Sequence, residues 1–284
     1  MDDSTFSFGH SDPEVLSAAL TRQYSEISKY MEANRLVIND DKTHLVVMST
    51  QSMSVKSNLV SLQAGIHTIT PTKSEKLLGC EINEDLKWRQ HILSSDQSTI
   101  RQLNSRINGL SMVSSRADFS TRLMVANGIV MSKICYLIQL WGGCEKYLIH
   151  SLQVQLNKAA RSVTRLSCFT STRCLMDSCG WLSVKQLVIY QSVIMIHKTM
   201  KTESPSYIHS RLSNPYTYRT RQNTSGSIRQ DETFSSKSSL PRTSFRYRGA
   251  HDYNQIPANI RNISNLTSFK VKLKQWIRRN ISIE

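Results

Sequence analysis

The stretch Met1-Asp2-Asp3-Ser4-Thr5, read together with Asn39-Asp40-Asp41-Lys42-Thr43, decides the fold that this sequence predicts. The first stretch sets two carboxylates side by side, and the second sets a Lys-Thr pair in a polar turn. Mg²⁺ takes one or two carboxylates beside substrate phosphates, and two such ions roughly 3.5–4 Å apart support nucleotidyl transfer. A turn carrying Asp2 and Asp3 is therefore a candidate metal site, although an isolated acidic pair near a chain end is more often solvated surface.

The residues around these stretches predict one helix with short strands. Alternation over residues 4–8 is typical of a strand. Asp12-Pro13-Glu14 has the order of an N-cap, a first helical position and an acidic first turn. Apolar residues then recur at three- and four-residue steps over 15–31, as on one face of a helix. Residues 36–38 and 45–48 predict two further strands.

Further segments follow at a defined spacing. They are Leu36, Asn39, Lys42 and Thr43 as Leu-x-x-Asn-x-x-Lys-Thr, then Leu78-Gly79, then Leu86-Lys87-Trp88-Arg89-Gln90-His91. In this order and register the segments resemble the reverse transcriptases of non-LTR (LINE-type) retrotransposons, from the catalytic Asp-Asp turn at the end of the palm through the thumb.

The resemblance implies an RNA-directed DNA polymerase, a nucleotidyltransferase that uses Mg²⁺. Asp2 would be a metal ligand and Asp3 its neighbour in the metal site. Lys42 would lie near the departing phosphates, where a lysine serves as a mobile point charge. Leu78 and Gly79 would form the hairpin that grips the primer terminus. The implied partners are an RNA template and a DNA primer or duplex.

The sequence also departs from this family. The family's site needs another Asp on an earlier strand and fingers that bind the nucleotide, and neither precedes Met1 in these 284 residues. The aromatic residue usual in the Asp-Asp turn is missing too. We therefore expect a fragment, from a truncated copy or a partial gene model, that does not polymerise alone. The alternatives are a non-catalytic nucleic-acid-binding helical module and an inert fragment.

Charge is divided unevenly along the chain. Residues 1–100 carry 9 Lys and Arg against 13 Asp and Glu, whereas residues 101–284 carry 27 against 8. An acidic start that holds metal and a basic remainder that holds phosphates are expected of a palm followed by a thumb. A basic surface without a dedicated partner is the alternative. Apolar stripes from residue 87 to residue 201 predict several helices with short links, which form a bundle.

The last third of the chain changes character twice. Residues 203–248 are rich in Ser, Thr, Arg and Tyr with little aliphatic periodicity, so they predict either a plain basic linker or a segment that stacks on single strands. Tyr253-Asn254-Gln255-Ile256-Pro257 and a basic helix from about Leu266 resemble the C-terminal signature of the same elements. The candidate nucleic-acid-binding residues of the whole chain are Arg161, Arg165, Arg173, Arg219, Arg221, Arg246, Arg248, Lys270 and Lys274.

The expected fold class is α+β: an incomplete polymerase palm, with a small antiparallel sheet and one helix, followed by a helical thumb-like bundle. The expected domains are a partial palm (1–85), a helical thumb region (86–202), a basic low-complexity linker (203–248) and a C-terminal basic helical segment (249–284). No signal peptide or transmembrane segment is recognisable, so we expect a cytoplasmic or nuclear protein without a membrane partner. The spacing of Cys168, Cys174 and Cys179 departs from structural zinc sites and favours free thiols.

Overall fold

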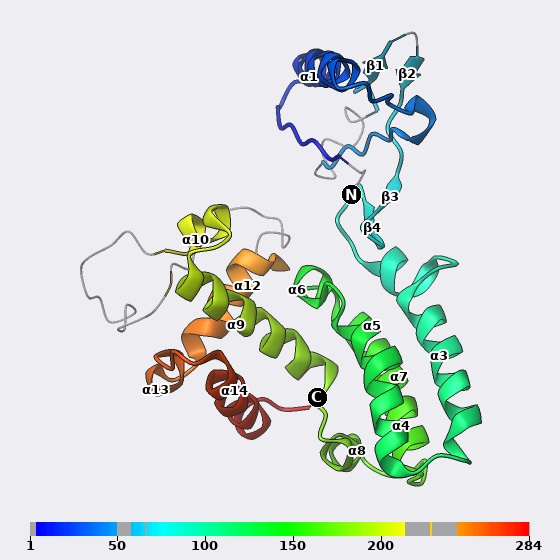
Figure 1. Ribbon diagram of the computed structural model, residues 1–284, viewed down its shortest axis with the longest axis vertical. Helices are drawn as coiled ribbons and strands as arrows, with labels where there is room; N and C mark the ends of the chain where they lie inside the picture. The colour runs from blue at the N-terminus through cyan, green and yellow to red at the C-terminus, as the bar shows by residue number, and fades with distance from the viewer. Residues whose placement is uncertain (1–3, 50–57, 66, 214–227, 229–242, 284) are drawn as a thin grey trace. The chain divides into compact units, whose positions relative to one another are not determined.

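The computed structural model describes residues 4–49, 58–65, 67–213, 228 and 243–283 (Figure 1). The chain divides into two compact units, Met1–Gln90 and His91–Glu284. The first unit has one long α-helix and two small antiparallel hairpins, and the second is helical. This arrangement confirms the expected α+β class and the expected order of a small β-containing part followed by helices.

Helix α1 (Pro13–Ala33) begins where the sequence predicts it. Asp12 is the N-cap, and its carboxylate accepts a hydrogen bond of 2.9 Å from the backbone N–H of Glu14. The apolar face of α1 packs on strand β1 through Leu16, Leu20 and Tyr24, yet α1 contains no fully buried residue. The first unit therefore has a shallow core.

Strands β1 (Leu62–Ala64) and β2 (His67–Ile69) form an antiparallel hairpin whose outer edge is covered by α1. The backbone N–H of Ser61 donates to the Ser17 hydroxyl at 3.1 Å, and that of Gln63 donates to the Thr21 hydroxyl at 3.3 Å. Residues four apart on a helix lie on one face, so two hydroxyls one turn apart satisfy a strand edge that would otherwise be open to pairing.

The strands expected at residues 4–8, 36–38 and 45–48 do not form, and these predictions were wrong. Residues 36–38 belong to no helix or strand, and Val37 is 96% exposed. Leu45 alone makes a single parallel bridge, to Pro71. A strand requires a partner for its backbone groups, and each sheet of this unit holds only two short strands in the described residues.

Strands β3 (Ser74–Leu77) and β4 (Cys80–Asn83) form the second hairpin, with Leu77 opposite Cys80. Its two-residue turn is Leu78-Gly79, with φ of 49° and 76°. Positive φ at both central positions is the geometry of a type I′ turn, which matches the twist of the flanking strands. Gly79 adopts it without strain, whereas Leu78 is a rare non-glycine residue in this region.

The second unit is built around two packed helices, α3 (Thr99–Ser114) and α7 (Lys146–Thr164). Their buried faces carry the apolar stripes that the sequence predicts, including Leu103 and Ile107 of α3 and Leu152 and Leu156 of α7. Helix α4 (Phe119–Ala126) packs beside both. A π-helical turn, η3 (Gln90–Ser94), leads into α3.

The apolar residues between positions 123 and 138 do not form one uninterrupted α-helix. Helix α4 passes through a π-helical turn, η4 (Asn127–Met131), into α5 (Ser132–Cys135). Leu137 then adopts φ of 51°, which ends the helix and redirects the chain into α6 (Ile138–Trp141). The indole N–H of Trp141 donates to the Tyr136 carbonyl at 2.9 Å and bridges this break.

Helices α8 (Thr172–Cys179), α9 (Val184–Thr202) and α10 (Ser206–Leu212) follow. Helix α9 starts with a capping box, in which Ser183 and Gln186 each bond the other's backbone N–H. Such reciprocal capping satisfies two donors that a helix start would leave unpaired. Most of the residues between α10 and the next described helix lie outside the described residues, and so do Arg219 and Arg221.

The C-terminal part packs on α9. Helices α12 (Phe245–Gln255) and α14 (Leu266–Asn280) both contact α9, and α13 (Ala258–Arg261) joins them (Figure 1). Helix α14 runs antiparallel to α9: Phe269 stacks on His197 near one end, with centroids 3.6 Å apart, and Gln186 donates to the Ile281 carbonyl at the other. The expected amphipathic helix from Leu266 is confirmed, and it belongs to the same compact unit as the preceding helices.

Among the described residues, no single helix has the length and apolar character required to cross a membrane. The bent pair of α8 and α9 reaches these limits only when its two helices are counted together.

Candidate nucleic-acid interface

The polymerase-like residues fall in the first unit. Asp2 and Asp3 lie outside the described residues, so the metal site expected there stays a prediction. Lys42 is the last residue of a short 3-10 helix, η1 (Asp40–Lys42), and its side chain is exposed. An exposed lysine at the end of a turn has the reach to neutralise a phosphate.

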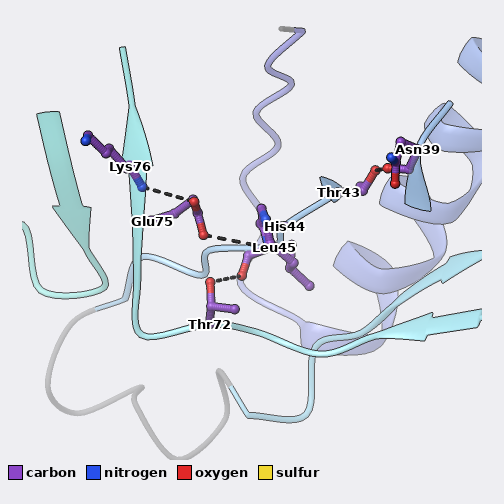
Figure 2. Close-up of polar contacts among 7 residues, drawn as sticks. All are labelled: Asn39, Thr43, His44, Leu45, Thr72, Glu75 and Lys76. Atoms are coloured by element: carbon purple, nitrogen blue, oxygen red, sulfur yellow. Dashed lines mark hydrogen bonds and ion pairs between the residues drawn. The ribbon is translucent and has the colours of Figure 1, made fainter. Parts of the chain in front are cut away.

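The turn that carries Lys42 is held by local bonds. The Thr43 hydroxyl donates to the Asn39 carbonyl at 3.1 Å, which closes the turn on itself (Figure 2). Two residues later, the Leu45 carbonyl accepts both the backbone N–H of Thr72, at 2.8 Å, and the Thr72 hydroxyl, at 3.2 Å. The Asn39–Thr43 turn is thereby joined to the chain that enters β3.

A second link connects this turn to the β3–β4 hairpin. His44 lies 3.7 Å from the Glu75 carboxylate, whose other oxygen accepts the backbone N–H of Lys76 at 3.1 Å (Figure 2). Both side chains of the His44–Glu75 pair are more than one-third exposed, so the pair contributes little energy by itself. Together with the Thr72 bonds, it links the Lys42 turn to strand β3 within the first unit, although the turn joins neither of the unit's two sheets in the described residues.

The hairpin tip presents an apolar side chain to its surroundings. Leu78 is 54% exposed although it stands at the centre of a turn. Its backbone geometry costs energy, which a glycine or asparagine would avoid. An exposed apolar tip on a narrow type I′ hairpin is suited to contact a sugar or base at a strand terminus.

The second unit has an unusual charge arrangement on its long helices. Among the described residues of the second unit, the four longest helices are α3, α7, α9 and α14. None of these four helices contains Asp or Glu. Their cations are Arg101 and Arg106, then Lys146, Lys158 and Arg161, then Lys185, Lys198 and Lys201, and then Lys270, Lys272, Lys274, Arg278 and Arg279. Arg101 is paired with Asp96, which lies just before α3, at 2.6 Å. The excess of positive charge on these helices is the electrostatic signature of a phosphate-binding surface.

Two of the expected binding residues help to hold the end of α7. Arg161 donates to the Cys168 carbonyl at 3.2 Å, and Arg165 donates to the Ser114 carbonyl while its side chain is exposed. Arg165 occupies the left-handed C-cap of α7. Lys158, one turn before them on the same helix, is exposed. At the end of α7, Lys158 and Arg165 are therefore exposed, whereas Arg161 is half-buried and its Nε is covered.

Arg246 and Arg248, which the sequence placed in a linker, lie in the first turns of α12. Arg248 is half-buried and donates to the Gln139 carbonyl at 2.9 Å. Burial lowers the pKa of Arg248, although the Asp252 carboxylate partly opposes this effect, and burial raises the pKa of Asp252 to about 6. Arg248 therefore serves the packing of α12 and is a poor candidate for an external phosphate.

Helix α14 offers two kinds of cation. Lys270, Lys272 and Arg279 are exposed, whereas Lys274 donates to the Gly180 carbonyl at 2.8 Å and is half-buried. Burial, followed by the charge of Arg278, lowers the pKa of Lys274. Lys272 and Arg279 are seven residues apart, two helical turns, and so project from the same outer face. The sequence pattern favoured Lys274 instead, because periodicity alone does not show which cation a neighbouring element covers.

The described residues hold no cluster of metal ligands. Within these ranges, no three His, Cys, Asp or Glu side chains are close enough to hold one metal ion. All six cysteines are free. Burial raises the pKa of Cys179 to about 11 and, together with Glu145, that of Cys144 to about 12. These thiols stay protonated at neutral pH and are poor metal ligands.

Comparisons with protein-family models, with curated proteins and with solved structures found no match to this chain.

Proposed function

We propose that this chain is part of an RNA-directed DNA polymerase of the non-LTR type, and that its helical unit binds the RNA–DNA duplex through phosphate contacts. The observation that carries the duplex-binding part of the proposal is the charge of the second unit, whose four longest helices in the described ranges hold cations and no acidic residue. Phosphate contacts position a duplex without reading its sequence, which suits an enzyme that copies any template.

The first unit supports the polymerase part of the proposal. The Lys42 turn and the Leu78-Gly79 hairpin, recognised as separate motifs, share one compact unit and are linked through Thr72 and Glu75. In the proposed reaction the primer 3′-hydroxyl attacks the α-phosphate, the hairpin holds the primer end, and Lys42 offsets the charge of the leaving pyrophosphate. Bound Mg²⁺, for which Asp2 and Asp3 are the proposed ligands, would stabilise that charge further.

Photo-crosslinking of the primer terminus tests this proposal. A DNA primer with a photoreactive base at its 3′ end, annealed to an RNA template, is irradiated with the full chain, and the crosslinked peptides are mapped by mass spectrometry. We expect a crosslink within residues 74–83, which contain the hairpin. The same base placed at the 5′ end of the primer is the control and should not label these residues. Crosslinks confined to the helical unit would contradict the polymerase assignment.

A second candidate function is a non-catalytic nucleic-acid-binding helical module. The basic second unit favours it as strongly as it favours the polymerase, because both require phosphate contacts. The crosslinking experiment separates the two, since a plain binding module has no reason to hold a 3′ terminus at the β3–β4 hairpin.

A further inference from the structure

A polar pocket of about 310 Å³ lies in the helical unit where α8, the start of α9 and the end of α14 meet. Figure 1 shows the C-terminus near the start of α9. The residues that line the pocket include Arg173, Met176, Asp177, Trp181, Gln186 and Arg278. Its volume lies at the lower end of the range of small-ligand pockets, about 300–1,000 Å³.

Two arginines line this pocket without a carboxylate partner. Neither Arg173 nor Arg278 belongs to an ion pair among the described residues. Arg278 is oriented by the bond from its Nη2 to the Trp181 carbonyl at 3.2 Å, and its Nε is buried without a hydrogen-bond acceptor. A buried cationic donor without a protein acceptor gains a hydrogen bond if an anion binds beside it. Arg173 is exposed and free to move toward an occupant.

The surroundings add positive charge. Lys274 lies one helical turn before Arg278, and Lys185 donates to the Ser282 hydroxyl at 3.2 Å beside the same chain end. Burial and the charge of Arg278 lower the pKa of Lys274, as expected where cations are close together. The Gln186 amide donates to the Ile281 carbonyl and accepts from the backbone N–H of Ser183, so it fixes the wall between the start of α9 and the end of α14. Asp177 is the one carboxylate among the lining residues.

We propose that this pocket binds a phosphate group, either free phosphate or a phosphodiester of a nucleic-acid strand. Arginine presents a planar fork that bonds phosphate oxygens in pairs, and a charge-assisted bond of this kind is about twice as strong as a neutral one. This proposal rests on the residues that line the pocket. It does not depend on whether the chain is part of a polymerase.

Titration of the full chain with inorganic phosphate tests the site. At constant ionic strength, ³¹P line broadening and the thermal midpoint of unfolding are followed as phosphate is added. We expect saturable broadening and a rising midpoint, because a ligand that binds only the native state stabilises it. Arg173→Gln should raise the Kd for phosphate roughly tenfold, about the loss of one charge-assisted bond.

Two further variants serve as controls, one expected to strengthen phosphate binding and one expected to leave it unchanged. Asp177→Asn removes the one lining carboxylate and should lower the Kd for phosphate. Lys29→Gln removes one positive charge from the exposed side of α1, in the first unit, and should leave the Kd unchanged. An equal response to phosphate in all four proteins would overturn the proposal, and so would the absence of saturable broadening in the unmodified chain.

A competition arm distinguishes the two sources of phosphate. Displacement of the phosphate signal by a short oligonucleotide supports the pocket as a backbone-phosphate site. Retention of the signal while the oligonucleotide is bound elsewhere supports a site for free phosphate. If phosphate binds but the oligonucleotide does not bind at all, the phosphate site is supported and the proposed nucleic-acid function is contradicted.

Discussion

At the scale of single residues, Gly142 and Gly143, which follow Trp141, have no room for a side chain. A side chain at Gly142 would lie 2.7 Å from a methyl carbon of Val188 on α9, and one at Gly143 would overlap the Thr243 carbonyl oxygen. The requirement is steric, since neither glycine has a positive φ. These residues let α6 approach α9 and the chain that enters α12, which join the C-terminal helices to the rest of the unit.

We expect Gly143→Ala to destabilise the helical unit by about 1–3 kcal/mol, because an added methyl group in a filled site forces backbone shifts. Gly109→Ala is the matched control. Gly109 lies within α3 with open space around it, and alanine there should stabilise by roughly 0.5–1 kcal/mol. Urea unfolding measures both changes. A loss of stability at Gly109, or none at Gly143, would contradict the packing described.

Because His91 is buried, the stability of the folded chain should depend on pH. Burial, followed by the charge of Lys133, lowers the pKa of His91 from 6.5 to about 4. The folded state therefore resists protonation that the unfolded state accepts. The stability contributed by neutral His91 is fully present above pH 6.5 and is lost as the pH falls toward about 4.

Urea unfolding between about pH 7 and about pH 4 checks this prediction. We expect His91→Gln to reduce the loss of stability over that range. His197, whose pKa burial also lowers, and Asp252, whose pKa burial raises to about 6, are present in both proteins, so their contributions cancel in the comparison. His150→Gln, on the exposed face of α7, is the control and should keep the original slope. An unchanged slope in His91→Gln would exclude His91 as the source.

The sequence did not predict which cations of the candidate interface are exposed to solvent. The binding residues expected from the sequence include Arg248 and Lys274, both of which donate to backbone carbonyls of neighbouring segments. They omit Lys198, Lys201, Lys272 and Arg279, all of them exposed. An arginine covered by a neighbouring helix and one in solvent look the same in a sequence, so the distinction needs tertiary structure.

At the scale of elements, helices were predictable from local signals, whereas the three strands expected from composition did not form. The hairpin turn at Leu78-Gly79 was expected only from the resemblance, and the structure has a hairpin there. Helix signals are local: Asp12-Pro13 starts α1, Ser183 with Gln186 starts α9, and apolar periodicity follows α3, α7 and α14. Strands depend on a partner elsewhere in the chain. Residues 36–38 have strand-like composition but no neighbour to pair with among the described residues, whereas the less apolar residues 74–77 and 80–83 pair across a tight turn.

The contact between α9 and α14 yields a prediction for a whole element. Phe269 is fully buried against His197, so Phe269→Ala should destabilise the helical unit by about 3–5 kcal/mol. Val271→Ala, two residues later on the exposed side, should change stability by no more than about 0.5 kcal/mol. Thermal and urea unfolding compare the two. Similar small effects would mean that α14 is not docked on α9.

At the scale of the whole molecule, the uneven charge read from the sequence agrees with the division into two units. The boundary at Gln90 falls close to the change from a slightly acidic to a strongly basic chain. The order of a small β-containing unit and a helical unit could be expected from this pattern together with the apolar periodicity. The assignment to reverse transcriptases rests on motif spacing and stays a proposal.

A polypeptide limited to these 284 residues should not extend a primer. In the family that the sequence resembles, the site also takes a further Asp and a nucleotide-binding part, and residues 1–284 show neither motif. Primer extension on an RNA template with Mg²⁺ measures the outcome. Extension that Asp2→Ala abolishes would show that a complete site forms from these residues alone.

The salt dependence of RNA–DNA hybrid binding shows most directly whether the helical unit holds nucleic acid by its phosphates. We predict tight binding at low salt, with log K falling linearly as log salt rises. Replacing Lys272 and Arg279 by Gln should reduce the slope by about 1 for each phosphate that is no longer neutralised. The matched control replaces Arg22 and Lys29, also seven residues apart and exposed, on α1, and should keep the slope. No binding at low salt, or the same slope in all three proteins, would contradict binding of phosphates by the helical unit.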